Sequence, residues 1–152
     1  MTDIEKKHKE KMIDMKAKHR SNIKTKKRSE RGLLMVNTGD GKGKSTAAYG
    51  TLVRALGWGH DVAVLQYVKG TWKTGEKEFF KRFPDLIRLE VMGEGFTWET
   101  QDRIRDIEAA EKAWQVSMDM LTSGEYDLVI LDELNIVLRN DYLDKEIVRD
   151  GL

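Results

Sequence analysis

The sequence contains no cysteine among its 152 residues and only one proline. Without cysteine, the chain can form no disulfide bond, no thiolate metal site and no cysteine nucleophile. It also has no run of eighteen apolar residues and no apolar N-terminal segment of the signal-peptide type. These absences predict a cytoplasmic protein without a membrane-spanning helix. A chain of this length suits one domain, and a hydrophobic core is feasible at this size.

The net charge of +1 hides an uneven distribution of charged residues. Residues 1–31 hold twelve lysines and arginines against five acidic residues, so this segment carries +7 and the remainder carries −6. We therefore predict a basic N-terminal arm or lid helix over residues 1–31 and a nucleotide-binding domain over residues 32–152. The arm has few apolar positions, which leaves open a disordered tail, an arm that orders over an anionic ligand and, least favoured, a nucleic-acid arm.

A glycine-rich loop between a predicted strand and a predicted helix is the most informative stretch. It comprises Thr38, Gly39, Asp40, Gly41, Lys42, Gly43, Lys44, Ser45 and Thr46. Glycines let the backbone curl so that its N–H groups surround phosphate oxygens, and the helix N-terminus adds partial positive charge. In this motif Lys44 would contact phosphate and Ser45 would bind Mg²⁺. We predict a phosphate-binding loop, although Thr38 stands where the general motif has glycine.

The remaining hydrophobic patterns predict an α/β fold in which a parallel sheet is flanked by helices. Strands are expected at about 33–37, 61–66, 86–92 and 127–131, and helices at 47–56, 76–83, 100–121, 134–139 and 142–149. In the longest helix, an apolar stripe is predicted to face the core. Its members are Ile104, Ile107, Trp114, Met118 and Leu121.

Two acidic residues, Asp132 and Glu133, follow the last predicted strand. An acid at the tip of a strand beside a phosphate loop typically holds Mg²⁺, directly or through water. We therefore predict that Ser45, Asp132 and Glu133 bind Mg²⁺ or Mn²⁺. The alternative is structural, since these charges also stand at the start of a predicted helix.

Phe96 and Trp98 lie one residue apart in a loop that also contains Gly93 and Gly95. Aromatic pairs are most often packed in a core. Glycine-rich loops, however, have weaker packing demands and are frequent ligand sites. The residues alone leave both interpretations open.

Three stretches, 36–50, 66–72 and 95–101, together with Leu131-Asp132-Glu133-Leu134, resemble the cytoplasmic ATP:corrinoid adenosyltransferases, which make the cobalt–carbon bond of coenzyme B12. The third stretch is the most specific, because generic phosphate-loop ATPases do not carry it. A threonine at position 38 is normal in this family. The resemblance implies a RecA-like P-loop fold, commonly dimeric. It also implies transfer of the 5′-deoxyadenosyl group of ATP to Co(I) of a corrinoid, with release of triphosphate, in coenzyme B12 biosynthesis or salvage.

The resemblance also implies roles for individual residues and partners. Lys44, Phe96 and Trp98 would be the catalytic residues, and the aromatic pair would pack beneath the corrin ring and displace its lower axial ligand. ATP would lie in the reverse direction to that of ordinary phosphate-loop enzymes. A reducing partner such as flavodoxin or reduced flavin would supply Co(I), and the basic arm would close over the corrinoid.

Members of this family usually continue beyond the last residue of this chain, so we expect the fold to be short at its C-terminus. Two other functions stay open at this point. One is a phosphate-loop ATPase or kinase of another type, which would release ADP. The other is a binder of nucleotide or corrinoid without catalytic activity.

Overall fold

The computed structural model describes residues 2–25, 31–68, 74–92 and 102–152. The chain forms two compact units, Met1–Met35 and Val36–Leu152. The first unit contains helix α1, Asp3–Thr25, which buries no residue. Glu5 and Thr2 cap its start, because the Thr2 backbone N–H donates to the Glu5 carboxylate and the Glu5 N–H donates to the Thr2 hydroxyl. Local bonds of this kind, rather than burial, stabilise α1.

The second unit is built on a parallel sheet of three strands in the order β2-β1-β3. Strand β1 spans Val62–Gln66, β2 spans Ile87–Val91 and β3 spans Leu128–Asp132. These are three of the four predicted strands, and the α/β class is confirmed. In the register, Gln66 at the end of β1 is paired with Asp132 at the end of β3. Two polar side chains therefore end neighbouring strands at the same edge of the sheet.

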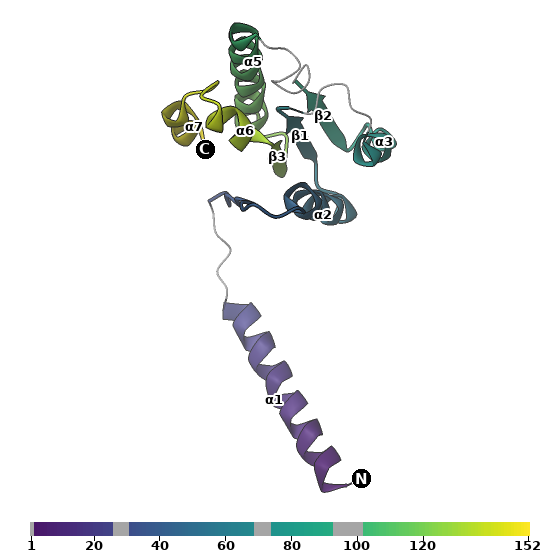
Figure 1. Ribbon diagram of the computed structural model, residues 1–152. Coiled ribbons are helices and arrows are strands. Elements are labelled where there is room, and N and C mark those ends of the chain that lie inside the picture. Colours follow the sequence, from purple (N-terminus) through teal and green to yellow (C-terminus); the bar gives the residue numbers. More distant parts are fainter. Residues whose placement is uncertain (1, 26–30, 69–73, 93–101) are drawn as a thin grey trace. The chain divides into compact units, whose positions relative to one another are not determined.

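Helices cover both faces of the sheet (Figure 1). Helix α2, Lys44–Gly57, lies on one face, and α5, Arg103–Thr122, lies on the other, beside α6, Leu134–Arg139, and α7, Lys145–Gly151. A short helix, α3, Gly75–Phe80, precedes β2. Every residue of β1 is buried, which explains why this strand reads as a continuous apolar run rather than an alternating one.

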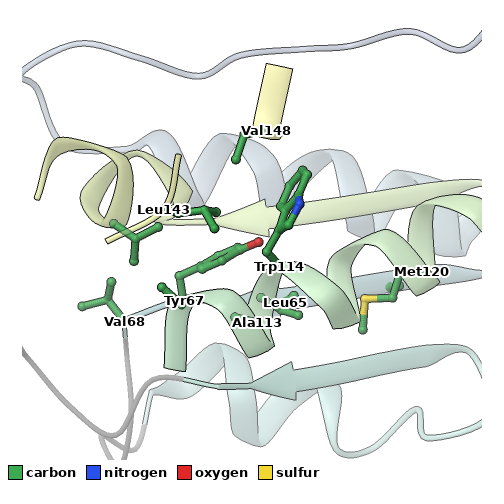
Figure 2. Packing of buried hydrophobic residues seen from close by; sticks show 11 residues of the cluster. Leu65, Tyr67, Val68, Ala113, Trp114, Met120, Leu143 and Val148 are labelled. Carbon is green, nitrogen blue, oxygen red and sulfur yellow. The ribbon is translucent and has the colours of Figure 1, made fainter. Parts of the chain in front are cut away.

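Alternate residues of β1 belong to two separate cores. Val62 and Val64 pack with Tyr49 and Leu52 of α2, whereas Ala63 and Leu65 pack in the cluster that contains α5. Figure 2 shows this second cluster, in which Trp114 lies among side chains of α5, α7 and the end of β1. Because side chains alternate along a strand, Gln66 follows Val62 and Val64 onto the α2 face.

The prediction of a strand at residues 33–37 is wrong. None of these residues lies in a strand, and Leu33 and Val36 are 83% and 73% exposed. An apolar run becomes a strand only where a neighbouring strand accepts its backbone hydrogen bonds. Within the described part of the chain, the sheet contains no strand that pairs with this segment.

The predicted stripe of α5 is wrong in part. Trp114 is buried, but Ile104 is 71% exposed, and the residues that α5 buries are Ala110, Ala113, Trp114, Ser117 and Met120. Three of these side chains are small, so the helix can approach the sheet closely. Position relative to the sheet, rather than hydrophobicity alone, therefore selected the buried face.

The other helices match their predictions with shifted ends. Helix α6 has the predicted bounds, while α3 ends at Phe80, before the turns that lead to Pro84. Helix α7 begins at Lys145 because the Asp144 carboxylate caps it by accepting from the Glu146 backbone N–H at 2.7 Å. Among helices in the described ranges, none is long and apolar enough to cross a membrane.

Candidate functional site

The predicted phosphate loop leads directly into α2. Gly43 is the N-cap residue with φ 106°, and Gly39 has φ 117°. Both values lie in the left-handed region that favours glycine, so the sharp curve of the loop depends on these two positions. The Ala47 backbone N–H donates to the Gly43 carbonyl at 2.8 Å and closes the first turn of the helix. The loop therefore presents the N-terminus of a fourteen-residue helix at its end.

The Lys44 side chain folds back across the same loop. Its ammonium group donates to the carbonyl oxygens of Gly39 at 2.7 Å and Gly41 at 2.6 Å. An ammonium group has three N–H donors, so one remains for a ligand. The Asn37 amide donates to the Lys44 carbonyl at 3.3 Å and ties the incoming chain to the helix start. Lys44 thus organises the loop and places a positive charge within its curve.

The structure brings Ser45 and Asp132 together from elements 87 residues apart in sequence. The Ser45 hydroxyl, in the first turn of α2, donates to Asp132 Oδ1 at 2.9 Å. Two oxygen ligands at right angles around Mg²⁺, each at roughly 2.0–2.1 Å, are about 2.8–3.0 Å apart. A hydroxyl and a carboxylate oxygen with this spacing fit two neighbouring positions of a magnesium ion.

The second oxygen of Asp132 is held by two side chains that the sequence analysis did not assign to the site. The Tyr49 hydroxyl of α2 donates to Oδ2 at 2.7 Å, and the Gln66 amide of β1 donates to the same oxygen at 3.2 Å. The Gln66 amide also donates to the Tyr49 hydroxyl at 2.6 Å. All three residues are buried. The carboxylate is therefore fixed in rotation, with Oδ1 toward Ser45.

Burial, together with the hydrogen bond and the charge of Asp132, raises the pKa of Tyr49 well above its usual value. The phenol keeps its proton and stays a donor to the carboxylate. Gln66 is only 2% exposed, and its Oε1 is a buried acceptor without a hydrogen-bond partner among the described residues. A buried amide oxygen of this kind commonly marks a place for a water or a ligand.

Glu133 follows β3 with φ 67°, a left-handed conformation that is uncommon outside glycine, and it is the N-cap residue of α6. It is half-buried beside Asp132 in sequence. Over the residues that the structure describes, no group of three or more His, Cys, Asp or Glu side chains could hold a metal ion. Binding of a cation by Ser45, Asp132 and Glu133 therefore stays a prediction.

Two of the stretches that carry the family resemblance lie largely outside the described residues. The aromatic pair Phe96 and Trp98 falls in residues 93–101, and most of the stretch 66–72 falls in residues 69–73. The contacts of Phe96 and Trp98 therefore stay predictions. The start of the helix that follows the aromatic pair is described, where the Asp102 carboxylate caps α5 by accepting from the backbone N–H groups of Ile104 and Arg105.

Sequence signals for Tyr49 and Gln66 do exist. Tyr49 stands four residues after Ser45, the spacing that places two side chains on one face of a helix. Gln66 ends an otherwise apolar strand and shares the parity of Val62 and Val64, so it faces the same way as they do. A phosphate loop followed by these two patterns predicts polar side chains that converge near the loop.

The chain is similar to members of one family of known proteins. A family model described as ATP:corrinoid adenosyltransferase BtuR/CobO/CobP matches residues 30–152. The chain is 52% identical over 137 residues to a corrinoid adenosyltransferase of Pseudomonas aeruginosa, covering 90% of this chain and 67% of that protein. It is 48% identical over 144 residues to one from a Sinorhizobium species, covering 93% and 67%, and 46% identical over 123 residues to one from Escherichia coli K12, covering 81% and 62%. The chain thus spans about two thirds of the length of the curated relatives it matches.

Proposed function

Because the chain belongs to the ATP:corrinoid adenosyltransferase family, we propose that it transfers the 5′-deoxyadenosyl group of ATP to Co(I) of a corrinoid in coenzyme B12 biosynthesis or salvage. The observation that carries the proposal is the family match, which includes the phosphate loop and the Ser45–Asp132 pair. The relatives bear the name corrinoid adenosyltransferase, and this name is the basis for assigning the reaction to this chain.

The reaction needs no general base from the protein. The Co(I) centre of the substrate donates an electron pair to the 5′ carbon of ATP, and the bond between that carbon and its oxygen breaks. The electron pair of that bond leaves with the triphosphate, while the cobalt becomes an alkylated Co(III). No proton moves at the reacting carbon. The protein therefore has to align the two substrates and stabilise a strongly anionic leaving group.

We assign the residues of the phosphate loop to the triphosphate. Its backbone N–H groups, the remaining donor of Lys44 and the exposed side chain of Lys42 would neutralise charge that builds up as the bond breaks. Ser45 and Asp132 would hold Mg²⁺ or Mn²⁺, with Glu133 beside them. A bound divalent cation would supply further positive charge to the phosphate oxygens.

Other parts of the proposal are based on the resemblance alone. Phe96 and Trp98 would pack beneath the corrin ring and displace its lower axial ligand, which makes Co(II) easier to reduce. A flavodoxin or reduced flavin would supply the electron, and the basic segment 1–31, most of it in helix α1, would close over the corrinoid. A homodimer in the cytoplasm is the expected form of the protein.

The products test the proposal. Purified full-length chain is mixed with ATP, Mg²⁺ and chemically reduced corrinoid, and the mixture is followed by visible spectroscopy and ion chromatography. We expect a light-sensitive cobalt–carbon product together with equal amounts of triphosphate. ADP and phosphate with unchanged corrinoid would identify a phosphate-loop ATPase instead. Absence of both products would favour a binding protein.

A further inference from the structure

We propose that Tyr49 and Gln66 act as positioning residues that leave Asp132 only one oxygen for a cation, and that they thereby make the site select Mg²⁺ over Ca²⁺. The inference depends on the proposed nucleotide–cation site and adds to it a determinant of metal specificity. Neither residue is expected to touch the nucleotide or the cobalt. Their effect would pass through the orientation of one carboxylate.

The two carboxylate oxygens of Asp132 have different hydrogen-bond partners. Oδ2 accepts from Tyr49 at 2.7 Å and from Gln66 at 3.2 Å, whereas Oδ1 accepts from Ser45 at 2.9 Å. The Ser45 bond at Oδ1 joins Asp132 to another predicted ligand of the cation. The protein interior therefore uses Oδ2, and the phosphate loop faces Oδ1.

The fold holds this division firmly in place. Tyr49 lies one helical turn after Ser45 on α2, and Gln66 is the register partner of Asp132 across two parallel strands. The Gln66–Tyr49 hydrogen bond of 2.6 Å joins the two donors to each other. Rotation of the carboxylate by a quarter turn would move Oδ2 away from its donors on α2 and β1 together. The burial of all three side chains makes such unpaired groups costly.

Cations differ in how they use carboxylates. Mg²⁺ requires near-octahedral geometry at roughly 2.0–2.1 Å and binds one oxygen of a carboxylate, whereas Ca²⁺ accepts six to eight oxygens at roughly 2.3–2.6 Å and often binds both. Because Oδ2 of Asp132 already accepts two hydrogen bonds, the carboxylate can bind Mg²⁺ through Oδ1 alone without rearrangement. Binding of Ca²⁺ through both oxygens would require loss of the bonds from Tyr49 and Gln66. The geometry therefore disfavours Ca²⁺ without weakening Mg²⁺.

A second observation is a buried acceptor in the same cluster that has no donor. Gln66 Oε1 is buried without a hydrogen-bond donor among the described residues, although the amide nitrogen of the same group has two acceptors. Mg²⁺ gives up its waters reluctantly and usually keeps several of them. A bound water would supply the donor that this amide oxygen lacks.

The test compares nucleotide affinity in two cations. Fluorescent N-methylanthraniloyl-ATP is titrated into the full chain at saturating Mg²⁺ or Ca²⁺. The dissociation constant in Ca²⁺ divided by that in Mg²⁺ is the ratio that reports the metal preference of the protein. Wild type is expected to bind the Mg²⁺ complex more tightly. Tyr49→Phe removes one donor to Oδ2 and should reduce the ratio by about tenfold, the effect of one hydrogen bond to a charged group. Most of this change should come from tighter binding of the Ca²⁺ complex.

Tyr67→Phe is the matched control, because it removes another buried tyrosine hydroxyl, one that contacts Ser117 rather than Asp132. This variant should keep the wild-type ratio. Gln66→Met is a second variant, which keeps the test possible if Tyr49→Phe does not fold. It should also reduce the ratio. A wild-type ratio in a folded Tyr49→Phe or Gln66→Met protein would overturn the inference, and so would equal affinity of wild type for both complexes.

The assay measures nucleotide binding without adenosyl transfer. A chain that binds nucleotide with the expected metal preference but forms no cobalt–carbon product would disprove the proposed function, while the positioning roles would be supported. If the chain forms the product but the variants keep the wild-type metal preference, the proposed function would be supported and the positioning roles would be disproved. The two proposals can therefore fail separately.

Discussion

Replacement of Lys44 by alanine tests the phosphate loop most directly. The ammonium group donates to the carbonyls of Gly39 and Gly41 at 2.7 and 2.6 Å, which uses two of its three N–H donors. The third donor is available to a phosphate oxygen. Lys44→Ala should therefore remove one charge-assisted hydrogen bond to the nucleotide and two bonds within the loop.

The expected magnitudes differ for binding and for stability. One charge-assisted bond is worth roughly 1.5–3 kcal/mol, which corresponds to a roughly ten- to 150-fold loss of ATP affinity. The carbonyls of Gly39 and Gly41 belong to exposed residues, so water can replace the ammonium group once it is removed. The free energy of unfolding should therefore fall by no more than about 1 kcal/mol. The loss of binding free energy for ATP should therefore exceed the loss of free energy of unfolding.

Isothermal titration with ATP and Mg²⁺ measures the first quantity, and urea denaturation measures the second. Lys145→Ala on α7 is the control, because this exposed lysine pairs with Asp141 at 3.2 Å instead of lying in the loop. It should change neither quantity beyond experimental error. Unchanged ATP affinity in a folded Lys44→Ala protein would refute the assignment. A loss of stability larger than the loss of affinity would mean that Lys44 serves the fold and not the ligand.

Three further predictions concern other parts of the chain. Phe96→Ala and Trp98→Ala should slow reduction of the corrinoid while ATP affinity stays unchanged; wild-type spectra of four-coordinate Co(II) in both variants would indicate ordinary packing. Residues 1–31 should be cut rapidly by trypsin in the free protein and slowly with ATP and corrinoid together, because their net charge of +7 favours order over an anionic partner; equal rates would support a tail without a ligand role. Burial raises the pKa of Tyr67 to about 12, so the folded chain keeps a proton that the unfolded chain loses above about pH 10. The free energy of unfolding should therefore fall as pH rises from 10 to 12, and Tyr67→Phe should reduce that slope in alkaline urea titrations; an identical slope would contradict this assignment.

Local sequence patterns predicted most of the secondary structure. Strands β1, β2 and β3 lie within one residue of their expected ends, and α6 has its expected bounds, because apolar runs and helix caps act over a few residues. The strand expected at 33–37 failed because a strand also needs a partner, which a local pattern does not contain. The buried face of α5 was predicted in part, since it depends on how closely the helix approaches the sheet.

The candidate site shows the same difference between local and distant information. The glycine loop was visible in the sequence because the positive φ values at Gly39 and Gly43 require residues of that type. The acidic residue that follows an apolar strand was visible as well. The family resemblance, found from these stretches, is confirmed by the match over residues 30–152. Tyr49 and Gln66 were not assigned to the site, because their hydrogen bonds to Asp132 join segments that are distant in sequence.

The sequence by itself determined the family, the class of fold, the loop and the identity of its lysine and serine, since each of these is encoded by neighbouring residues. Only the tertiary structure decided which oxygen of Asp132 faces Ser45 and which is held by Tyr49 and Gln66. That choice depends on the register of β1 with β3 and on the packing of α2 against their shared face. Hydrogen-bond geometry among three distant segments is a property of the folded chain, because tenths of an ångström in their relative positions separate a bond from its absence.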